Sequence, residues 1–184
     1  MPCACLVVAF LRGDPSRWWD RFVMDGTFGP FVHTEVALTD GRGLVRAYSS
    51  FEGVGGVVPV PPGRYGPEWE LVSVPLAEHG FARLYASVLS LISLQIPYNS
   101  GDLWQCCVSA FLPYESDIDE TRLDSWRRGV FCSQFACLLL RLGLSQGSVL
   151  LPDVPRAHLR AVHSRGCSPN ALFRILTGGC PARV

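Results

Sequence analysis

The pattern of hydrophobic and polar positions predicts strands in the first half of the chain. Residues 5–10 form a short, β-branched apolar run, which is typical of a buried strand. Residues 31–38 and 44–50 flank a Gly-containing turn cluster, and this segment predicts a β-hairpin. Residues 69–74 predict another strand, and the Pro- and Gly-rich stretch 57–67 before it predicts a connection.

The hydrophobic period then changes to that of helices. Apolar residues recur at helical spacing over 78–94, which predicts a helix with one face on the sheet. A turn at 96–102 precedes a second helix that runs through Cys107 to Phe111. Residues 113–128 are polar and predict a surface excursion.

Three further helices are predicted. A short amphipathic helix lies within 16–28, and a strong apolar stripe over 131–142 forms a helix that Gly143 is expected to end. The last helix runs to Leu176, with Ser168 as its N-cap and Pro169 in its first turn.

Together these elements predict an α+β fold with an antiparallel sheet of about four to six strands packed against helices. A chain of 184 residues is the size of one domain, and no repeat or second linker divides it, so residues 1–184 are expected to form a single domain. The apolar share of 48% suits one buried core.

Charge and composition narrow the classes of partner. The formal net charge is zero, which argues against field-driven binding to nucleic acid. The longest apolar run near the N-terminus is far too short to span a membrane, and no signal peptide is expected there. All 16 basic residues are arginine, which codon bias explains; a chain without lysine also offers no side-chain amine for ubiquitin-like conjugation.

The eight cysteines predict free thiols in a reducing, cytoplasmic setting, because a domain of this size needs no disulfide scaffold. Cys3 with Cys5, and Cys106 with Cys107, lack the spacing by which two sulfurs bind one zinc ion from a tight turn. No metal site is therefore expected.

Cys132 is the candidate nucleophile because it opens the helical run after Phe131. A thiol at a helix N-terminus meets the positive end of the helix dipole and free backbone N–H groups, which lower its pKa and can hold an oxyanion. Among the four histidines, His33 is the best candidate base, since it lies within a predicted strand. Cys137 lies among leucines in the same helix, so it is expected to be an unreactive, packed thiol.

The third member of the site stays open. Glu35 shares a strand face with His33 and can orient its ring. A hairpin turn centred near Gly41 places Ser50 opposite His33 and Tyr48 opposite Glu35. Glu52 is a further candidate acid.

The order of these motifs resembles the circularly permuted NlpC-type branch of papain-like hydrolases, and in particular members encoded by large DNA viruses. The motifs are Gly29-Pro-Phe-Val-His-Thr-Glu-Val36, Tyr98-Asn99, Phe131-Cys-Ser-Gln-Phe135 and Ser168-Pro-Asn-Ala-Leu172. In that family histidine precedes cysteine in the chain. This sequence lacks the usual serine or tyrosine before His33, and Gln134 stands where glutamate is commoner.

The resemblance implies a permuted papain-like fold and a cysteine–histidine dyad with a polar third residue, without metal or organic cofactor. It also places Tyr98 near the site, although Tyr98 is equally explained as a turn aromatic, and makes Ser133 a candidate for the oxyanion or substrate site. The implied reaction passes through an acyl-enzyme on Cys132. The implied substrate is a protein or peptide, including ubiquitin-like conjugates, so the first hypothesis is a thiol peptidase or deconjugase.

Three alternatives remain. Lecithin–retinol acyltransferase-like relatives share the permuted site and act on lipid esters, but they carry an Asn-Cys-Glu-His box and a membrane-anchoring tail that are not found here. Adenovirus-type proteases have the same order of residues and would use Glu52 as the acid. A non-catalytic binding module is the third alternative, supported by a cluster of aromatic residues: Trp18, Trp19, Phe22, Phe28 and Phe31.

Overall fold

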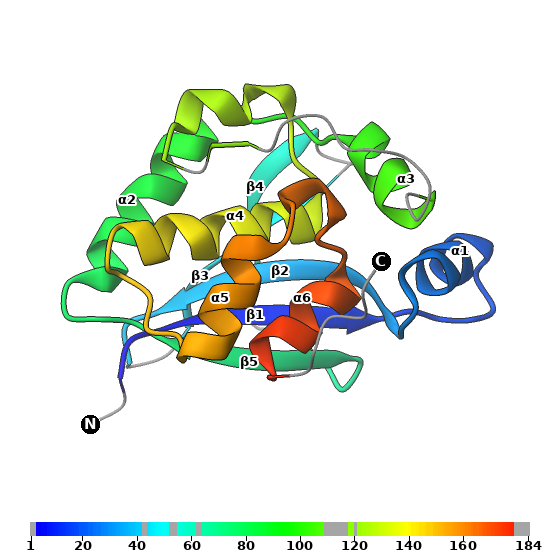
Figure 1. Cartoon of the computed structure of the whole chain (residues 1–184), viewed down its shortest axis with the longest axis horizontal. Coiled ribbons are helices and arrows are strands. Elements are labelled where there is room, and N and C mark those ends of the chain that lie inside the picture. The colour runs from blue at the N-terminus through cyan, green and yellow to red at the C-terminus, as the bar shows by residue number, and fades with distance from the viewer. Residues whose placement is uncertain are drawn as a thin grey trace.

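A five-stranded antiparallel sheet is the base of the fold (Figure 1). The computed structural model describes residues 3–41, 44–51, 55–61, 64–108, 118–119 and 121–178. The strands are β1 (Cys5–Arg12), β2 (Phe31–Thr39), β3 (Leu44–Phe51), β4 (Gly56–Val60) and β5 (Trp69–Pro75). They lie in the order β4-β3-β2-β1-β5, so β2, which carries His33, is the central strand.

The described residues also contain six α-helices, which include a long central one. These are α1 (Trp18–Thr27), α2 (Gly80–Ser93), α3 (Ser100–Val108), α4 (Cys132–Ser145), α5 (Asp153–Ala161) and α6 (Pro169–Leu176). Two 3₁₀ helices, η3 (Leu123–Arg128) and η4 (Ser164–Gly166), precede α4 and α6. Figure 1 shows α4, α5 and α6 on one side of the sheet, with α1 and α3 together at one end.

Helix α4 is enclosed on nearly every side. All of its residues from Cys132 to Leu140 are buried, although the sequence predicts only one apolar stripe. This helix therefore lies inside the core, between β2, β3 and the other helices. The core that holds it includes Leu6, Val8, Phe10, Val36, Leu38, Val74, Phe135, Leu138, Leu139 and Leu172.

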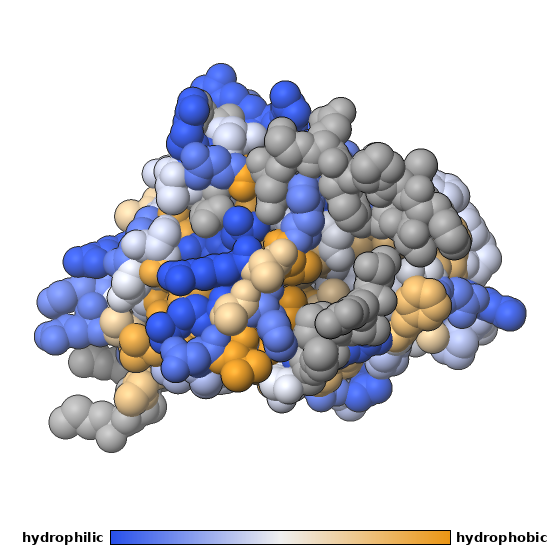
Figure 2. Space-filling model, in the orientation of Figure 1, coloured by the Kyte–Doolittle hydropathy of each residue, from blue (hydrophilic) through white to orange (hydrophobic). Residues whose placement is uncertain are grey.

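The outer helices α5 and α6 have two faces. Their buried residues, among them Leu159, Leu172 and Ile175, point into the core. On the outer side, Figure 2 shows hydrophilic residues with hydrophobic ones visible between them. Helix α4 is therefore interior, with α5 and α6 on its outer side.

The α+β class and the antiparallel sheet are confirmed, but the prediction of a plain connection over 57–67 is wrong. Strand β4 occupies the start of that stretch. Pro59 argues against a strand at the sequence level, because proline has no N–H to donate to a neighbouring strand. The structure tolerates Pro59 because β4 is an edge strand that pairs with β3.

The prediction that Gly143 ends α4 is also wrong. The helix continues to Ser145, and Gly147 follows it with a left-handed φ of 64°. A Cβ on Gly143 would lie 2.4 Å from Val149 Cγ2. Gly143 is therefore required for close packing of Val149 and not for helix termination.

Two polar segments are more ordered than their composition predicts. Within the predicted surface excursion, Trp126 of η3 is fully buried and its ring lies 6.4 Å from that of Phe135. The Arg-rich stretch after Pro152 forms α5, which the sequence analysis did not predict. Part of the excursion, 113–117, lies outside the described residues.

No described helix combines the length and the apolar character that crossing a bilayer requires.

Candidate functional site

Cys132 is the first residue of α4 and lies at its N-terminus. Phe131 before it is extended, with φ −92° and ψ 173°, so the helix begins at the cysteine. The backbone N–H groups of Ser133 and Thr34 both donate to the sulfur of Cys132. Two N–H donors and the positive end of the helix dipole stabilise the thiolate form.

The N–H of Thr34 can reach this sulfur because β2 and β3 separate at this point. Their pairing ends at Val36 and Tyr48, although both strands continue further. The N-terminus of α4 lies against this opening: the hydroxyl of Ser50 on β3 donates to the carbonyl of Val130 at 2.6 Å. The two strands thus hold the helix start from both sides.

His33 on β2 forms a side-chain hydrogen bond with Cys132. Its Nε2 lies 2.9 Å from Ser49 Oγ and 3.4 Å from Glu35 Oε1. Nε2 therefore faces both Ser49 and Glu35. The His33 side chain is 14% exposed and Cys132 only 2%, so the dyad is largely shielded from water.

The pKa values of the dyad move in opposite directions. Burial lowers the pKa of His33, but the thiolate of Cys132 and the carboxylate of Glu35 outweigh it and raise that pKa to about 9. Burial likewise raises the pKa of Cys132, but the charge of His33 and the two N–H donors bring it below its ordinary value. Both shifts favour the thiolate–imidazolium form of the pair.

Glu35 also pairs with a cationic side chain, Arg64. Arg64 Nη2 lies 2.7 Å from Glu35 Oε1, and its guanidinium also stacks over the Trp69 ring at 5.6 Å. Burial, followed by the negative charge of Glu35, raises the pKa of the nearby Tyr65 hydroxyl. Arg64 and Tyr65 lie in a stretch predicted as a plain connection, so sequence reasoning missed them.

The predicted cross-strand partners of His33 and Glu35 are wrong by one residue. Tyr48 pairs with Val36, not with Glu35, so continuing this register brings Ser49 opposite Glu35. The cause is a bulge on β3: Leu38 pairs with Arg46 and Thr39 with Leu44. One extra residue exchanges the two faces of a strand.

The bulge gives Ser49 and Ser50 opposite roles. Ser49 contacts His33, whereas Ser50, the predicted candidate, is buried against the backbone before Cys132. Glu52, the other predicted acid, lies outside the described residues. Within the described part of the chain, Glu35 is the carboxylate that contacts His33.

Tyr98 and Ser133 both lie near Cys132. Tyr98 packs against a buried group that includes Cys132 and Phe131. Ser133 reaches the sulfur through its backbone N–H, and its hydroxyl is fully buried. Its contribution to the site is therefore a main-chain donor, of the kind that stabilises an oxyanion.

The predicted aromatic cluster divides into two parts. Phe31 is buried in the core, with its ring 5.5 Å from Phe10, so it cannot belong to a contact patch. Trp18 and Phe28 are 76% and 70% exposed. A chain of ring contacts runs from Trp18 through Trp19 and Phe22 to Trp104 on α3.

No protein-family model matches the sequence, and no curated protein or solved structure matches it significantly. The site is therefore interpreted from its own geometry.

The other described cysteines provide a contrast to Cys132. None of the described cysteines forms a disulfide. Burial raises the pKa of Cys107 to about 11, and it raises that of Cys106 even further. The Cys137 and Cys167 thiols contact each other in the core, and that contact raises the pKa of Cys167. In contrast to Cys106, Cys107 and Cys167, Cys132 has a pKa that is lowered.

A pocket of about 260 Å³ borders the acid of the site. Glu35, Ser49 and Arg64 supply its polar wall, and Phe51, Val58, Pro59, Val60 and Pro61 supply its apolar wall. A small molecule in this pocket would contact the two groups that hold the His33 ring.

Asn170 ties α6 to Phe31 at the start of β2, two residues before His33. Its amide donates to Thr27 Oγ1 at 2.6 Å and to the Phe31 carbonyl at 2.9 Å, and it accepts from the Phe31 N–H at 3.0 Å. The sequence motif contained Asn170, but only the fold shows that it fixes this strand.

Replacing Asn170 with alanine is expected to lower the free energy of unfolding by about 2–4 kcal/mol, because buried partners lose their hydrogen bonds. Urea denaturation followed by tryptophan fluorescence measures the loss. Thr177→Ala, an exposed change just after α6, is the matched control. A loss for Asn170→Ala no larger than that of the control would contradict this role.

Proposed function

We propose that the chain is a cysteine hydrolase with Cys132 as nucleophile, His33 as acid and base, and Glu35 as the residue that orients His33. The observation that carries the proposal is the thiol of Cys132, which lies at the start of α4, accepts two backbone N–H groups and hydrogen-bonds His33. A buried thiol kept for packing needs none of these contacts. The neighbouring Cys106 and Cys107 have higher pKa values than an ordinary thiol.

The reaction follows from the thiolate–imidazolium pair. The thiolate of Cys132 attacks a carbonyl carbon, and backbone N–H groups at the helix start stabilise the negative oxygen that forms. The bond to the leaving group breaks as His33 donates its proton to that group, which leaves a thioester. His33 then takes a proton from water, whose oxygen attacks the thioester, and the acid product departs with the thiolate restored.

We further propose the permuted papain-like fold for this domain. An antiparallel sheet packs against a long buried helix, the nucleophile opens that helix, and the histidine comes from a strand earlier in the chain. The order histidine before cysteine is the order of the permuted NlpC-type branch. Amide and isopeptide bonds are the first substrate class.

Esters of apolar acids are the second substrate class, which the aromatic side chains of α1 favour. Trp19 and Phe22 pack against the buried group that contains Cys132, and Trp18 extends this ring contact to the surface. An acyl chain would find an apolar surface there. Assays with a peptide amide panel and an acyl ester panel distinguish the two classes.

Cysteine labelling at pH 6 tests the proposal. An ordinary thiol with a pKa of about 8.5 is less than about 1% ionised at this pH, whereas a thiolate paired with imidazolium still reacts. Limiting iodoacetamide, with the adducts located by mass spectrometry, is expected to label Cys132 at least about tenfold faster than Cys3. Cys3 is the internal reference because it is exposed.

Two results would contradict the proposal. The first is labelling that follows exposure, with Cys3 faster than Cys132. The second is hydrolysis of either substrate panel that persists in Cys132→Ser. Cys137→Ser, which changes a buried thiol of the same helix, is the matched control and is expected to keep its activity.

A further inference from the structure

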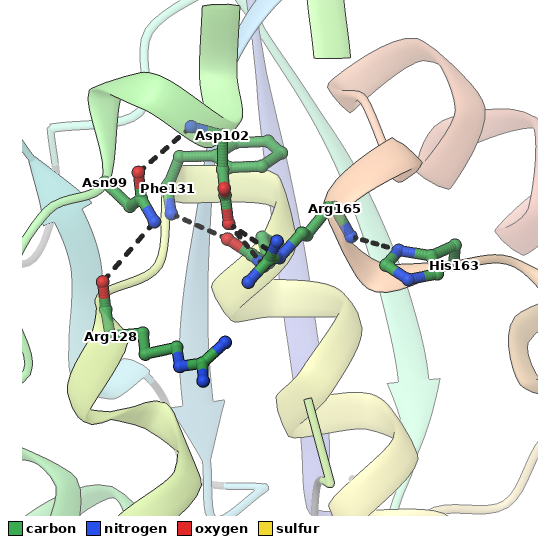
Figure 3. A network of polar contacts seen from close by, with 7 residues as sticks. Asn99, Asp102, Arg128, Phe131, His163 and Arg165 are labelled. Carbon is green, nitrogen blue, oxygen red and sulfur yellow. Dashed lines mark hydrogen bonds and ion pairs between the residues drawn. The ribbon is translucent and has the colours of Figure 1, made fainter. Parts of the chain in front are cut away.

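Three buried polar side chains meet behind the start of α4 (Figure 3). They are Asp102 of α3, Gln134 of α4 and Arg165 of η4, and each is at most 7% exposed. Asp102 Oδ2 lies 3.2 Å from Arg165 Nε and accepts from Gln134 Nε2 at 3.3 Å. Elements far apart in the sequence thus converge on one carboxylate.

Gln134 connects this carboxylate to the start of the nucleophile helix. Its Oε1 accepts the N–H of Phe131, the residue before Cys132, at 3.2 Å. The Asp102 carboxylate can only accept hydrogen bonds. It therefore fixes the orientation of the Gln134 amide, with the amide nitrogen toward α3 and the amide oxygen toward Phe131. Asp102 therefore sets which atom of Gln134 faces the N-terminus of α4.

Asp102 and Arg165 are themselves held in place. Asn99 Oδ1 accepts the N–H of Asp102 at 3.0 Å, and Asn99 Nδ2 donates to the carbonyl of Arg128 at 3.4 Å (Figure 3). The N–H of Arg165 donates to His163 Nδ1 at 3.3 Å. The carboxylate and the guanidinium thus have fixed positions relative to the segment that leads into Cys132.

The charges of this group also matter to the thiol. A buried carboxylate near a thiolate opposes it, and a guanidinium beside the carboxylate cancels most of that effect. The charge of Asp102 does reach this region: burial, then the neighbouring thiols Cys107 and Cys132, and then Asp102 raise the pKa of Cys106. Buried ion pairs contribute little net stability in general, so stability alone does not explain why the Asp102–Arg165 pair lies here.

We infer that Asp102, Gln134 and Arg165 are positioning residues for Cys132. They hold the first turn of α4 through the Phe131 N–H, and Arg165 keeps the carboxylate of Asp102 from opposing the thiolate. This inference rests on the proposed role of Cys132 as the nucleophile. It also explains why position 134 is glutamine: Asp102 already supplies the carboxylate that Arg165 binds, so a second one would lack a partner.

A charge swap tests the inference with little change of side-chain volume. Gln134→Glu adds a carboxylate beside Asp102 and is expected to raise the pKa of Cys132 by about one pH unit, which moves the acidic limb of its alkylation profile upward by that amount and slows alkylation about tenfold on that limb. The double variant Asp102→Asn with Gln134→Glu exchanges the amide and the carboxylate. It is expected to react within about threefold of the wild type, because Arg165 again binds one carboxylate.

The measurement is the rate of Cys132 alkylation by iodoacetamide as a function of pH, with thermal unfolding recorded for each variant. Gln146→Glu adds a carboxylate just after the far end of α4, and its pH profile is expected to match the wild type. A Gln134→Glu profile that also matches the wild type overturns the inference, as does a double variant no faster than Gln134→Glu. Slow Cys132 labelling in the wild type itself overturns the proposed function instead, so the two failures are distinguishable.

Discussion

Replacing His33 with alanine is expected to lower hydrolysis by about 1,000-fold, because the thiol loses both its base and its counter-charge. Burial alone raises the pKa of Cys132, and the charge of His33 is the largest influence that opposes this effect. Without the ring, Cys132 becomes a buried thiol like Cys107, whose pKa is about 11. Steady-state hydrolysis and the pH profile of Cys132 alkylation measure the two effects.

The expected pH profile of the wild type follows from the pKa shifts of Cys132 and His33. The thiolate is lost as the pH falls below the lowered pKa of Cys132, and the imidazolium is lost as the pH rises through about 9. Hydrolysis needs both, so its profile is expected to be bell-shaped, with an alkaline limb near pH 9. In His33→Ala, alkylation is expected to begin only at alkaline pH.

His79→Asn is the matched control. The His79 side chain is 78% exposed, and its φ of 62° is one that asparagine tolerates. This variant is expected to keep the activity and the pH profile of the wild type. Alkylation of Cys132 in His33→Ala at the wild-type rate and pH would show that the thiol does not depend on the imidazole.

Replacing Glu35 with glutamine is expected to lower hydrolysis by about 10- to 100-fold and to move the alkaline limb to lower pH. Glutamine keeps the size of the side chain but removes the negative charge that helps raise the pKa of His33. The ring then depends on Ser49 Oγ for its orientation. The shift of the alkaline limb separates this electrostatic effect from a simple loss of fold.

Glu70→Gln provides the comparison for Glu35→Gln. Glu70 Oε2 lies 2.6 Å from Arg12, but both side chains are well exposed, so this change is expected to have little effect. If Glu35→Gln kept its alkaline limb near the wild-type pH, Glu35 would not be the orienting acid. Ser49→Ala would then be the next variant to measure.

The candidate site could be predicted where local pattern and helix-end chemistry suffice. Cys132 was identified because it begins an apolar helical run, and His33 because it lies within a strand; the structure brings the two side chains into hydrogen-bonding contact. Glu35 followed from the alternation of a strand, and it lies 3.4 Å from the His33 ring. These inferences depend on period and position within one element, which the sequence displays directly.

Errors arose where the deciding contact lies between elements. The bulge on β3 exchanges Ser50 for Ser49 beside His33, and nothing in the local pattern predicts a bulge there. Pro59 made a strand resemble a loop, since its tolerance depends on the strand being at the sheet edge. Gly143 resembled a helix terminator, since Val149 packs on it from outside the helix.

The sequence by itself determined the α+β class, the hairpin that carries His33, and the helix that Cys132 begins. Only the tertiary structure decided which groups surround that thiol: the Thr34 N–H freed where β2 and β3 separate, the Arg64 partner of Glu35, and the Asp102–Arg165 pair behind Gln134. The physical reason is that periodicity records which face of one element is buried. Register, strand separation and the meeting of charges depend on several elements at once.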